Sequence, residues 1–435
     1  MLPALCLCLV IQTSPIVVSI DHGKFSPRRL KLLATGTLSI ENHDATPYTV
    51  ESPGLFAGDV IIPPKGKIEV SPLYEAGTYT AMIEETPNDE ITIDFEGRPV
   101  DDPLLRETPF DAARRRDRQP LLFEPGAEPA YGAFTTFNIS VKGEAARQSL
   151  LKDLYRLQEQ LSDDRPPTEL AAYFTPESWQ RLCPSVALIV GLGPTAYDAR
   201  RFSPKVAYSR PKGLHPFMLG PKVQAPLSPT KDLIVRATSD SHWFNLRVCR
   251  LVWSRLKGRI AAPTLESGYA PPRGRSPILG GFFDGIGNPS GADRERAAYA
   301  GGNGSYLSYF RIAFDEARFA KLPRSAQEAL VGRTKTSGHL VKGSLNSHRE
   351  RAQNDGKSLI VRMPFIFDDG PSETGLLFTS AQASIDRQFE RILSTFMLPK
   401  PHRDSLLSYM KFESAAYYYI PPSPRGSFPG SLRGL

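Results

Sequence analysis

The stretch Gly280-Gly-Phe-Phe-Asp-Gly-Ile-Gly-Asn-Pro-Ser-Gly291 is the most informative part of the chain. It places five glycines and a proline around one carboxylate, that of Asp284. Glycine adopts backbone conformations closed to other residues, and proline and aspartate favour turns, so the stretch predicts a tight, irregular loop. Such a loop can present Asp284 beside a flat ligand without bulky side chains in the way. A plain Asp-Gly turn is the alternative interpretation.

Around this loop, from Tyr131 onward, the pattern is α+β. Apolar runs typical of strands alternate with segments of helical spacing, at 134–141 (strand), 144–161 (helix), 185–192 (strand), 232–237 (strand) and 242–256 (helix). The order of strands and helices, with short connections, predicts a ferredoxin-like sheet with helices on one face. A second such unit is predicted from the segments 305–314, 325–331, 359–365, 375–381 and 385–396.

The glycine-rich loop resembles the GxxDG motif of dye-decolourising (Dyp-type) haem peroxidases, in its longer GFxDGxxNP form. Other segments resemble that family in the same order: VALIVGLGPTAYD (186–198), KDLIVRATSD (231–240), GSYLSYFRI (304–312), QEALVGRTK (327–335), SH (347–348), IVR (360–362) and GLLFTSAQ (375–382). The resemblance extends from about Tyr131 to Tyr419. It implies two ferredoxin-like halves, a haem b cofactor and peroxidase activity, in a branch similar to the deferrochelatases.

The resemblance also implies which residues act on the distal side of the haem. Asp284 would take a proton from bound hydrogen peroxide and deliver it to the leaving oxygen. Asn288 would orient the peroxide. Arg362 would stabilise the negative charge that develops as the O–O bond breaks, with a strand-edge salt bridge as the alternative. The residues that would bind the cofactor are Gly281, Phe282, Gly285 and Arg362.

On the proximal side, the resemblance implies that His348 is the axial ligand of the haem iron. Of seven histidines, His348 matches the Ser-His of the family. The following residues depart from the family pattern, because Arg-Glu replaces the expected apolar residue and arginine. The family's acid, which would hydrogen-bond the imidazole, falls at Ser384, with Asp386 two residues on. These departures leave open which acid, if any, supports His348.

The implied reaction is the one-electron oxidation of bulky, dye-like organic substrates by hydrogen peroxide. Since bulky substrates cannot enter a buried haem pocket, electrons are expected to travel through tyrosines, for which core packing is the alternative: Tyr306, Tyr309 and 417–419. Two other hypotheses are a haem-binding deferrochelatase or iron-handling protein linked to iron uptake, and a structural member that no longer holds haem. The partners expected are peroxide and a reducing substrate, and homo-oligomerisation is left open.

Residues 16–98 consist of short alternating runs separated by turns, a pattern that predicts a small all-β sandwich. The run 38–51 and those after it resemble the cupredoxin-like domain of periplasmic iron-uptake proteins of the EfeO type. A blue-copper site needs two histidines and a cysteine, and this segment contains no cysteine. Copper binding is therefore not expected, and His22 and His43 are predicted to be surface turn residues.

Composition sets the broad limits. A chain of 435 residues, 40% hydrophobic and 23% charged, is typical of a soluble globular protein with more than one domain. Residues 99–130, rich in proline, arginine and aspartate, predict a linker before a peroxidase domain at 131–425. The net charge is +7, but only 114–116 form a tight basic run, so a nucleic-acid partner is not expected.

Residues 1–15 are interpreted as a signal peptide. The apolar run Leu2–Ile11 has the length of a signal-peptide core and is too short to span a membrane. A first buried strand is the alternative, because a basic start and a clear cleavage site are lacking. A periplasmic or secreted location is expected, with the cytoplasm as the alternative. Cys183 and Cys249 are predicted to be buried apolar residues, since no cysteine pair has zinc-binding spacing.

Overall fold

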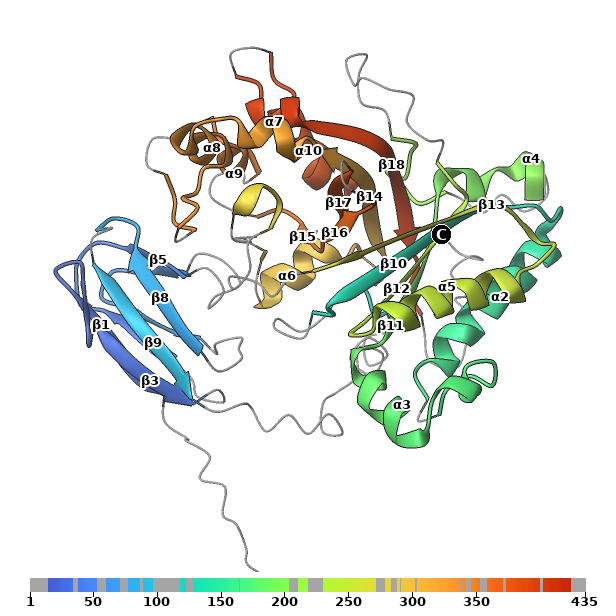
Figure 1. Ribbon diagram of the computed structural model, residues 1–435, viewed down its shortest axis with the longest axis horizontal. Coiled ribbons are helices and arrows are strands. Elements are labelled where there is room, and N and C mark those ends of the chain that lie inside the picture. The colour runs from blue at the N-terminus through green and yellow to red at the C-terminus, as the bar shows by residue number, and fades with distance from the viewer. Residues whose placement is uncertain are drawn as a thin grey trace, which may run out of the picture. The chain divides into compact units, whose positions relative to one another are not determined.

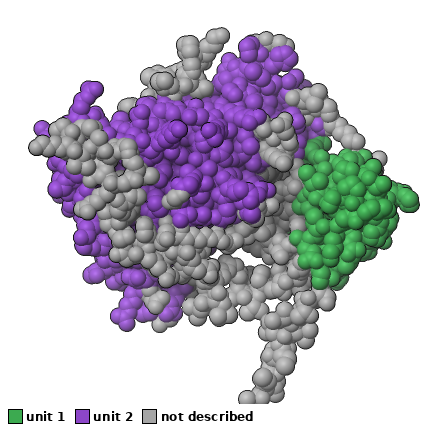
Figure 2. Space-filling view, turned by 180° about the vertical axis from the view of Figure 1, so that it is seen from behind, with its two compact units in different colours: residues 1–101, 337–340 green, residues 102–336, 341–435 purple. Residues whose placement is uncertain are grey.

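The computed structural model describes residues 15–33, 38–52, 60–70, 77–86, 89–96, 118–122, 128–163, 165–202, 210–217, 230–270, 278–282, 288–289, 291–301, 303–336, 338–341, 346–352, 358–370, 373–399 and 402–423 (Figure 1). The chain divides into two compact units (Figure 2). Unit 1 is Met1–Asp101 with Ser337–Leu340, and unit 2 is Asp102–Thr336 with Val341–Leu435. Within the described ranges, no helix has the length and apolar character needed to cross a membrane.

Unit 1 is built from strands, which confirms the predicted all-β N-terminal region. One sheet has the order β2-β1-β4-β7 and the other the order β3-β9-β8-β5-β6. The strands are β1 (Ile16–Asp21), β2 (Lys24–Ser26), β3 (Arg29–Leu33), β4 (Leu38–Asn42), β5 (Tyr48–Glu51), β6 (Val60–Ile62), β7 (Lys67–Val70), β8 (Gly77–Ile83) and β9 (Glu90–Glu96). Alternate residues of these strands, such as Val18 and Ile20, meet in one apolar core. The cupredoxin-like assignment stays a prediction.

The two histidines of the N-terminal segment lie at the surface of unit 1. The His22 side chain is 97% exposed, and His22 occupies a turn with φ 52°. His43 follows β4, and its Nδ1 lies 2.9 Å from Asp21 Oδ1. The predicted signal peptide falls almost entirely outside the described residues.

The first half of unit 2 is a ferredoxin-like unit, as predicted. Its strands follow the order β11-β12-β10-β13, and α2 and α5 cover one face (Figure 1). Its elements are β10 (Tyr131–Ile139), α2 (Glu144–Gln160), η1 (Ala171–Tyr173), α3 (Pro176–Leu182), η2 (Cys183–Ser185), β11 (Ala187–Leu192), η3 (Pro194–Tyr197), α4 (Ala199–Phe202), β12 (Leu233–Ser239), α5 (His242–Arg255) and β13 (Ile260–Tyr269). Cys183 and Cys249 are buried in this half, as predicted, and burial raises the pKa of the Cys249 thiol to about 12.

The second half repeats the arrangement with the strand order β18-β14-β17-β16, and β15 pairs with β17 beside β16. Its elements are η4 (Leu279–Gly281), α6 (Gly291–Ala298), β14 (Ser305–Phe314), α7 (Glu316–Ala320), α8 (Arg324–Val331), α9 (His348–Ala352), β15 (Val361–Arg362), β16 (Phe365–Asp368), β17 (Thr374–Gln382), the π-helix η5 (Ile385–Phe389), α10 (Glu390–Phe396), η6 (Ser405–Tyr409) and β18 (Met410–Ile420).

The two sheets meet along both edges. Strand β18 pairs with β11, and β13 pairs with β16. The strands therefore enclose an inner core that includes Tyr309 and Tyr418, while the outer face of the second sheet packs Tyr306 and Tyr417 under α10. Because side chains alternate along a strand, Tyr418 packs in the inner core, whereas Tyr417 and Tyr419 pack in the outer one. These tyrosines therefore contribute to core packing, which was the alternative to a role in electron transfer.

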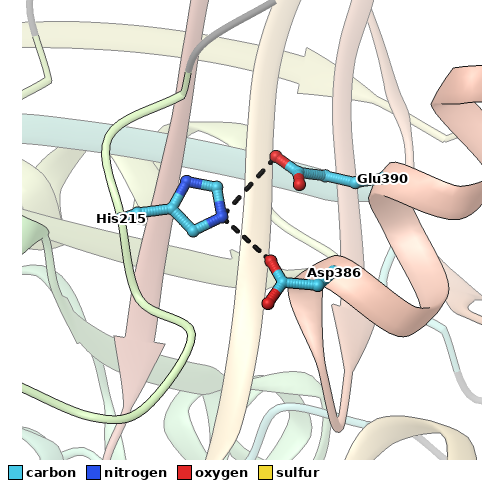
Figure 3. Close-up of side chains that lie close together, drawn as sticks. All are labelled: His215, Asp386 and Glu390. Carbon is cyan, nitrogen blue, oxygen red and sulfur yellow. Dashed lines mark hydrogen bonds and ion pairs between the residues drawn. The ribbon is translucent and has the colours of Figure 1, made fainter.

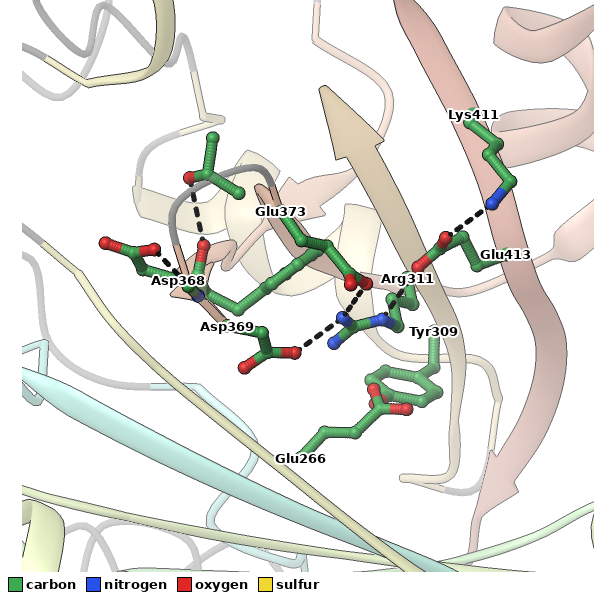
Figure 4. A network of polar contacts seen from close by, with 11 residues as sticks. Glu266, Tyr309, Arg311, Asp368, Asp369, Glu373, Lys411 and Glu413 are labelled. Carbon is green, nitrogen blue, oxygen red and sulfur yellow. Dashed lines mark hydrogen bonds and ion pairs between the residues drawn. The ribbon is translucent and has the colours of Figure 1, made fainter. Parts of the chain in front are cut away.

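A network of ion pairs at the surface connects strands of the second sheet (Figure 4). Arg311 on β14 contacts three carboxylates, at 2.6 Å (Asp369), 2.8 Å (Glu373) and 2.9 Å (Glu413). The Arg311 guanidinium also lies over the Phe367 ring, 3.7 Å from its centroid. The network joins β14, β18 and the turn between β16 and β17.

The predicted linker 99–130 needs correction at its C-terminal part. Residues 118–122 belong to unit 2, and both Gln119 and Leu121 are buried there. The Gln119 amide accepts from Val190 N (2.7 Å) and donates to Val190 O and Pro421 O, both at 3.0 Å. It therefore bridges β11 and the residue after β18, where these two strands share a single paired position. A composition rich in proline and charge did not reveal this role.

Replacing Gln119 with leucine is expected to lower the free energy of unfolding by about 3 kcal/mol. The change leaves one N–H and two carbonyl groups in the protein interior without their partner, at about 1–3 kcal/mol for each unsatisfied group, partly relieved by relaxation. Urea unfolding of the full chain measures the effect. Gln180→Leu, at an exposed position of α3, is the control. Equal stability of the two variants would contradict the bridging role.

Candidate active site

His348 begins the short helix α9, and its surroundings fix the start of that helix. The Ser347 hydroxyl accepts a hydrogen bond from Glu350 N at 3.3 Å, as a helix-capping residue does. Gly332 lies against this serine with φ +90°, and a Cβ there would approach Ser347 Oγ to 2.4 Å. A glycine at position 332 therefore permits the close packing that places the Ser-His pair.

Asp404 holds the His348 imidazole. The distance from His348 Nδ1 to Asp404 Oδ2 is 2.6 Å, and the Asp404 side chain is only 1% exposed. The other carboxylate oxygen accepts from Leu406 N at 2.9 Å and caps η6. Because an ionised carboxylate only accepts hydrogen bonds, Nδ1 carries a proton, and in the neutral ring Nε2 keeps its lone pair. This is the arrangement by which carboxylates orient histidine ligands and raise their basicity.

The acid that supports His348 is therefore neither Ser384 nor Asp386, the positions considered from the sequence. The Ser384 hydroxyl accepts from Arg387 N at 3.3 Å and caps η5. Asp386 contacts His215 at 3.1 Å. Sequence reasoning missed Asp404, which lies 56 residues from His348. Its one local signal was an aspartate directly before Ser405-Leu-Leu, a helix-start pattern.

Helix α10 supports the other side of the imidazole. The rings of His348 and Phe396 stack at 4.8 Å between centroids and 24° between planes. Arg351 Nη1 donates to Thr395 O at 2.9 Å, and Thr395 Oγ1 donates to Arg351 O at 2.8 Å. These contacts leave the His348 ring little freedom to rotate, while its side chain is 31% exposed.

Asn288 and Arg362 are brought together by the structure. Asn288 Nδ2 donates to Arg362 O at 2.9 Å, and Arg362 N donates to Asn288 Oδ1 at 2.8 Å. The Asn288 side-chain amide thus makes the two hydrogen bonds to the Arg362 backbone that a neighbouring β-strand would make. Its visible function is to position Arg362, and the direct contact with peroxide stays a prediction.

The Arg362 guanidinium is partly buried and also reaches the end of α9. It donates to Ser358 Oγ at 2.7 Å and to the carbonyl of Ala352 at 2.6 Å. Burial lowers the pKa of Arg362 to about 10, so the side chain keeps its positive charge at neutral pH. A fixed cation is thereby connected to the helix that carries His348.

The described part of the glycine-rich loop is anchored by aromatic packing. Gly280 has φ +69°, and a Cβ there would meet the Phe319 ring at 2.9 Å. Phe282 is buried in a small core with Phe319 and Leu406, two residues after Asp404. This core connects the start of the loop with the Asp404 segment. Asp284 and Gly285 lie outside the described residues, and the cofactor contacts of Gly281 and Phe282 stay predictions.

The donor set fits a haem on the His348 side. Haem iron in peroxidases is held by a neutral imidazole, and here Nε2 has no hydrogen-bond partner among the described residues, while Nδ1 is held by a buried carboxylate. The partial exposure of the ring leaves a direction from which a planar group can approach. His348 would hold the iron, and Arg362 is the charged group that would act beside it.

Replacing Asp404 with asparagine is expected to weaken haem binding or peroxidase activity by about 10–100-fold. One amide oxygen cannot fully replace two carboxylate oxygens, so either the His348 contact or the η6 cap is lost. The measurement is haem titration and steady-state peroxidase assay. Asp315 caps α7 by accepting from Arg318 N at 3.0 Å, so Asp315→Asn is the matched control. Unchanged haem affinity and activity in Asp404→Asn would contradict the assignment.

Comparisons with known proteins find similarity to Dyp-type peroxidases. Residues 276–425 match the family model described as Dyp-type peroxidase, C-terminal. No curated protein matches the chain. Similar solved structures include a putative Dyp-type peroxidase from Shewanella oneidensis, with 22% identity, a TM-score of 0.57 and coverage of 71% of this chain and 95% of that one. The DyP-type peroxidase from Cellulomonas bogoriensis has 20% identity, a TM-score of 0.59 and coverage of 71% and 94%.

A variant of DypB from Rhodococcus jostii RHA1, solved in complex with haem, has 22% identity, a TM-score of 0.57 and coverage of 71% and 96%. At these identities the likeness shows a shared fold, including both ferredoxin-like halves. The family model adds the sequence match across the region that holds Asn288, His348, Arg362 and Asp404. Residues 276–425 thus match the C-terminal region of Dyp-type peroxidases, and the chain shares the fold of solved members of that family.

Proposed function

We propose that the chain uses hydrogen peroxide to oxidise bulky, dye-like organic substrates in one-electron steps. The observation that carries the proposal is the contact of His348 with the buried Asp404, at 2.6 Å, with the charged Arg362 bound to the end of the same helix. When bound, haem supplies the iron and porphyrin that accept and release electrons. In the overall reaction, peroxide takes two electrons and two protons and leaves as two waters, while two substrate molecules each give one electron.

The residues of the chain divide the remaining tasks. Asp404 keeps the proton on His348 Nδ1, which would leave Nε2 free to hold the haem iron. Asp284 moves a proton from the near oxygen of peroxide to the far oxygen, which then leaves as water. Arg362 holds a positive charge where negative charge develops on that oxygen. Asn288 positions the arginine backbone.

Tyrosines give electrons from bulky substrates a route to the interior. Tyr309 is buried, and its hydroxyl donates to Glu266. Burial raises the pKa of Glu266, against the hydrogen bond from Tyr309, which lowers it. A tyrosine that loses an electron must also release its phenolic proton, and Glu266 is a base placed to receive it. Tyr306 and 417–419 extend the aromatic packing around this position.

A turnover experiment distinguishes this function from deferrochelatase activity. Full-length protein loaded with haem is mixed with peroxide and a bulky anthraquinone dye, and dye oxidation and metal-free porphyrin fluorescence are followed together. Many dye molecules oxidised per haem, without porphyrin fluorescence, are expected. Release of metal-free porphyrin with no dye turnover would favour the iron-handling hypothesis instead. A periplasmic or secreted site of action is part of the proposal.

A further inference from the structure

A second polar cluster lies on the outer face of the C-terminal sheet. His215, from the described segment 210–217, points its ring toward two carboxylates, Asp386 on η5 and Glu390 at the start of α10 (Figure 3). His215 Nε2 is 3.1 Å from Asp386 Oδ1 and 3.6 Å from Glu390 Oε1. The three ligand-type atoms all lie within 4.8 Å of one another.

The two separations from His215 Nε2 are close to those between neighbouring ligands of one metal ion. Nitrogen and oxygen ligands bind zinc and similar ions at about 2.0–2.2 Å, so neighbouring ligands of a shared ion lie about 3.0–3.5 Å apart. Asp386 and Glu390 are four residues apart at the junction of two helical segments, which places both carboxylates on one face. Like charges at this spacing repel each other unless a cation lies between them.

The hydrogen bond on the other side of the imidazole determines which atom faces the carboxylates. His215 Nδ1 lies 2.9 Å from the carbonyl of Pro216. Because a carbonyl oxygen only accepts, Nδ1 carries a proton there. In the neutral ring, Nε2 then directs its lone pair at the Asp386 oxygen, which is repulsive. A positive charge between them, either a metal ion or a second proton on the ring, removes the repulsion.

Neighbouring groups hold the three ligands in place. The Tyr417 hydroxyl donates to Glu390 Oε1 at 3.1 Å, and the rings of Tyr417 and His215 pack edge to face at 5.4 Å. The Tyr306 hydroxyl donates to Lys212 O and fastens the segment that carries His215. Held ligands with hydrogen-bonded partners are typical of metal sites. Asp386 is 60% exposed, which gives an ion access from solvent.

We propose that His215, Asp386 and Glu390 form a binding site for a divalent first-row transition-metal ion, separate from the haem site. Zn²⁺, Mn²⁺ and Fe²⁺ bind to imidazole nitrogen and carboxylate oxygen, the ligand atoms present here. Ca²⁺ instead requires six or more oxygen ligands. Two carboxylates neutralise the charge of the ion, and water completes its coordination. The ion would tie the segment 210–217 to α10, the helix whose Phe396 stacks on His348.

The test is calorimetric titration of the full-length protein, first dialysed against a chelator, with Zn²⁺ and separately with Mn²⁺ at pH 7.5. One ion is expected at this site, with a rise in the unfolding temperature. His215→Gln and Asp386→Asn should each weaken metal binding at least 10-fold. Because the Asp386 side chain is 60% exposed, Asp386→Asn is expected to fold like the parent protein. Tyr417→Phe removes only the hydrogen bond to Glu390 and should weaken binding by about 10-fold.

His242→Gln is the matched control, because His242 is an exposed histidine that contacts the Ser267 hydroxyl at 3.0 Å. Its titration should equal that of the parent. The proposal is overturned if neither ion binds the parent or changes its unfolding temperature, which is the result expected when a second proton alone occupies the space beside Nε2. It is also overturned if the site variants bind both ions as tightly as His242→Gln does.

Discussion

Full-length protein with His348 replaced by alanine is expected to purify with little or no haem. The imidazole is the iron ligand implied by the family, and its Nδ1 is held by Asp404 at 2.6 Å, so Nε2 is the one ring atom left to bind iron. Loss of an axial ligand removes the bond that fixes the iron in the protein. The haem content per chain, from the Soret absorbance after reconstitution, measures the effect.

Added imidazole should restore part of the Soret band, because it can occupy the space left by the side chain. His402→Ala is the control, since His402 is an exposed histidine two residues before Asp404. Full haem loading of His348→Ala, with the same Soret maximum as the parent, would contradict the assignment of the axial ligand.

The variants Asp284→Asn and Arg362→Leu are expected to slow the reaction with peroxide while haem content is retained. A placed proton-transfer group contributes about 10²–10⁴-fold in rate, and a fixed charge donor about 10²–10³-fold. Asn288 binds the backbone of residue 362, so its two hydrogen bonds survive the leucine substitution. Stopped-flow mixing with peroxide, followed at the Soret band, gives the rates.

The two effects should not add in the double variant, because both groups act on one transition state. Asp293→Asn and Arg391→Leu, at exposed positions of α6 and α10, are the controls and should react as the parent does. Single variants at 284 and 362 that react as fast as these controls would exclude the distal assignment.

The two ferredoxin-like halves were predictable because most of their strands are buried on both faces. The segments 305–314 and 375–381 are strands, as their high content of apolar and aromatic residues indicates. Strand β13 was not predicted, since Pro263 and Gly268 interrupt its pattern and many of its residues are exposed. The run of tyrosines drew attention to part of β18, but its full extent depends on pairing with β14, which is far away in sequence.

The candidate site was only partly predictable, for a related reason. His348 and Arg362 lie in short segments that resemble the family pattern, so they could be proposed as candidates from the sequence alone. Asp404 acts through a contact made across 56 residues, and a local pattern shows only that it starts a helical turn. Asn288 is similar, because its pairing with the Arg362 backbone depends on how the loop and β15 meet in the fold.

The hydrogen bonds of the buried Gln119 were also not predictable from the sequence. Its surroundings in sequence are charged and rich in proline, as in a linker, yet its amide bridges β11 and the chain after β18. A side chain that replaces missing strand pairing can be identified only once the strands are placed.

One visible spectrum of the haem-loaded full-length protein, before and after one equivalent of hydrogen peroxide, tests the central claim most directly. A haem peroxidase with an imidazole ligand should show one Soret band per chain, which changes within the mixing time and returns when a reducing dye is added. A protein that takes up no haem, or whose Soret band peroxide leaves unchanged, would contradict the account.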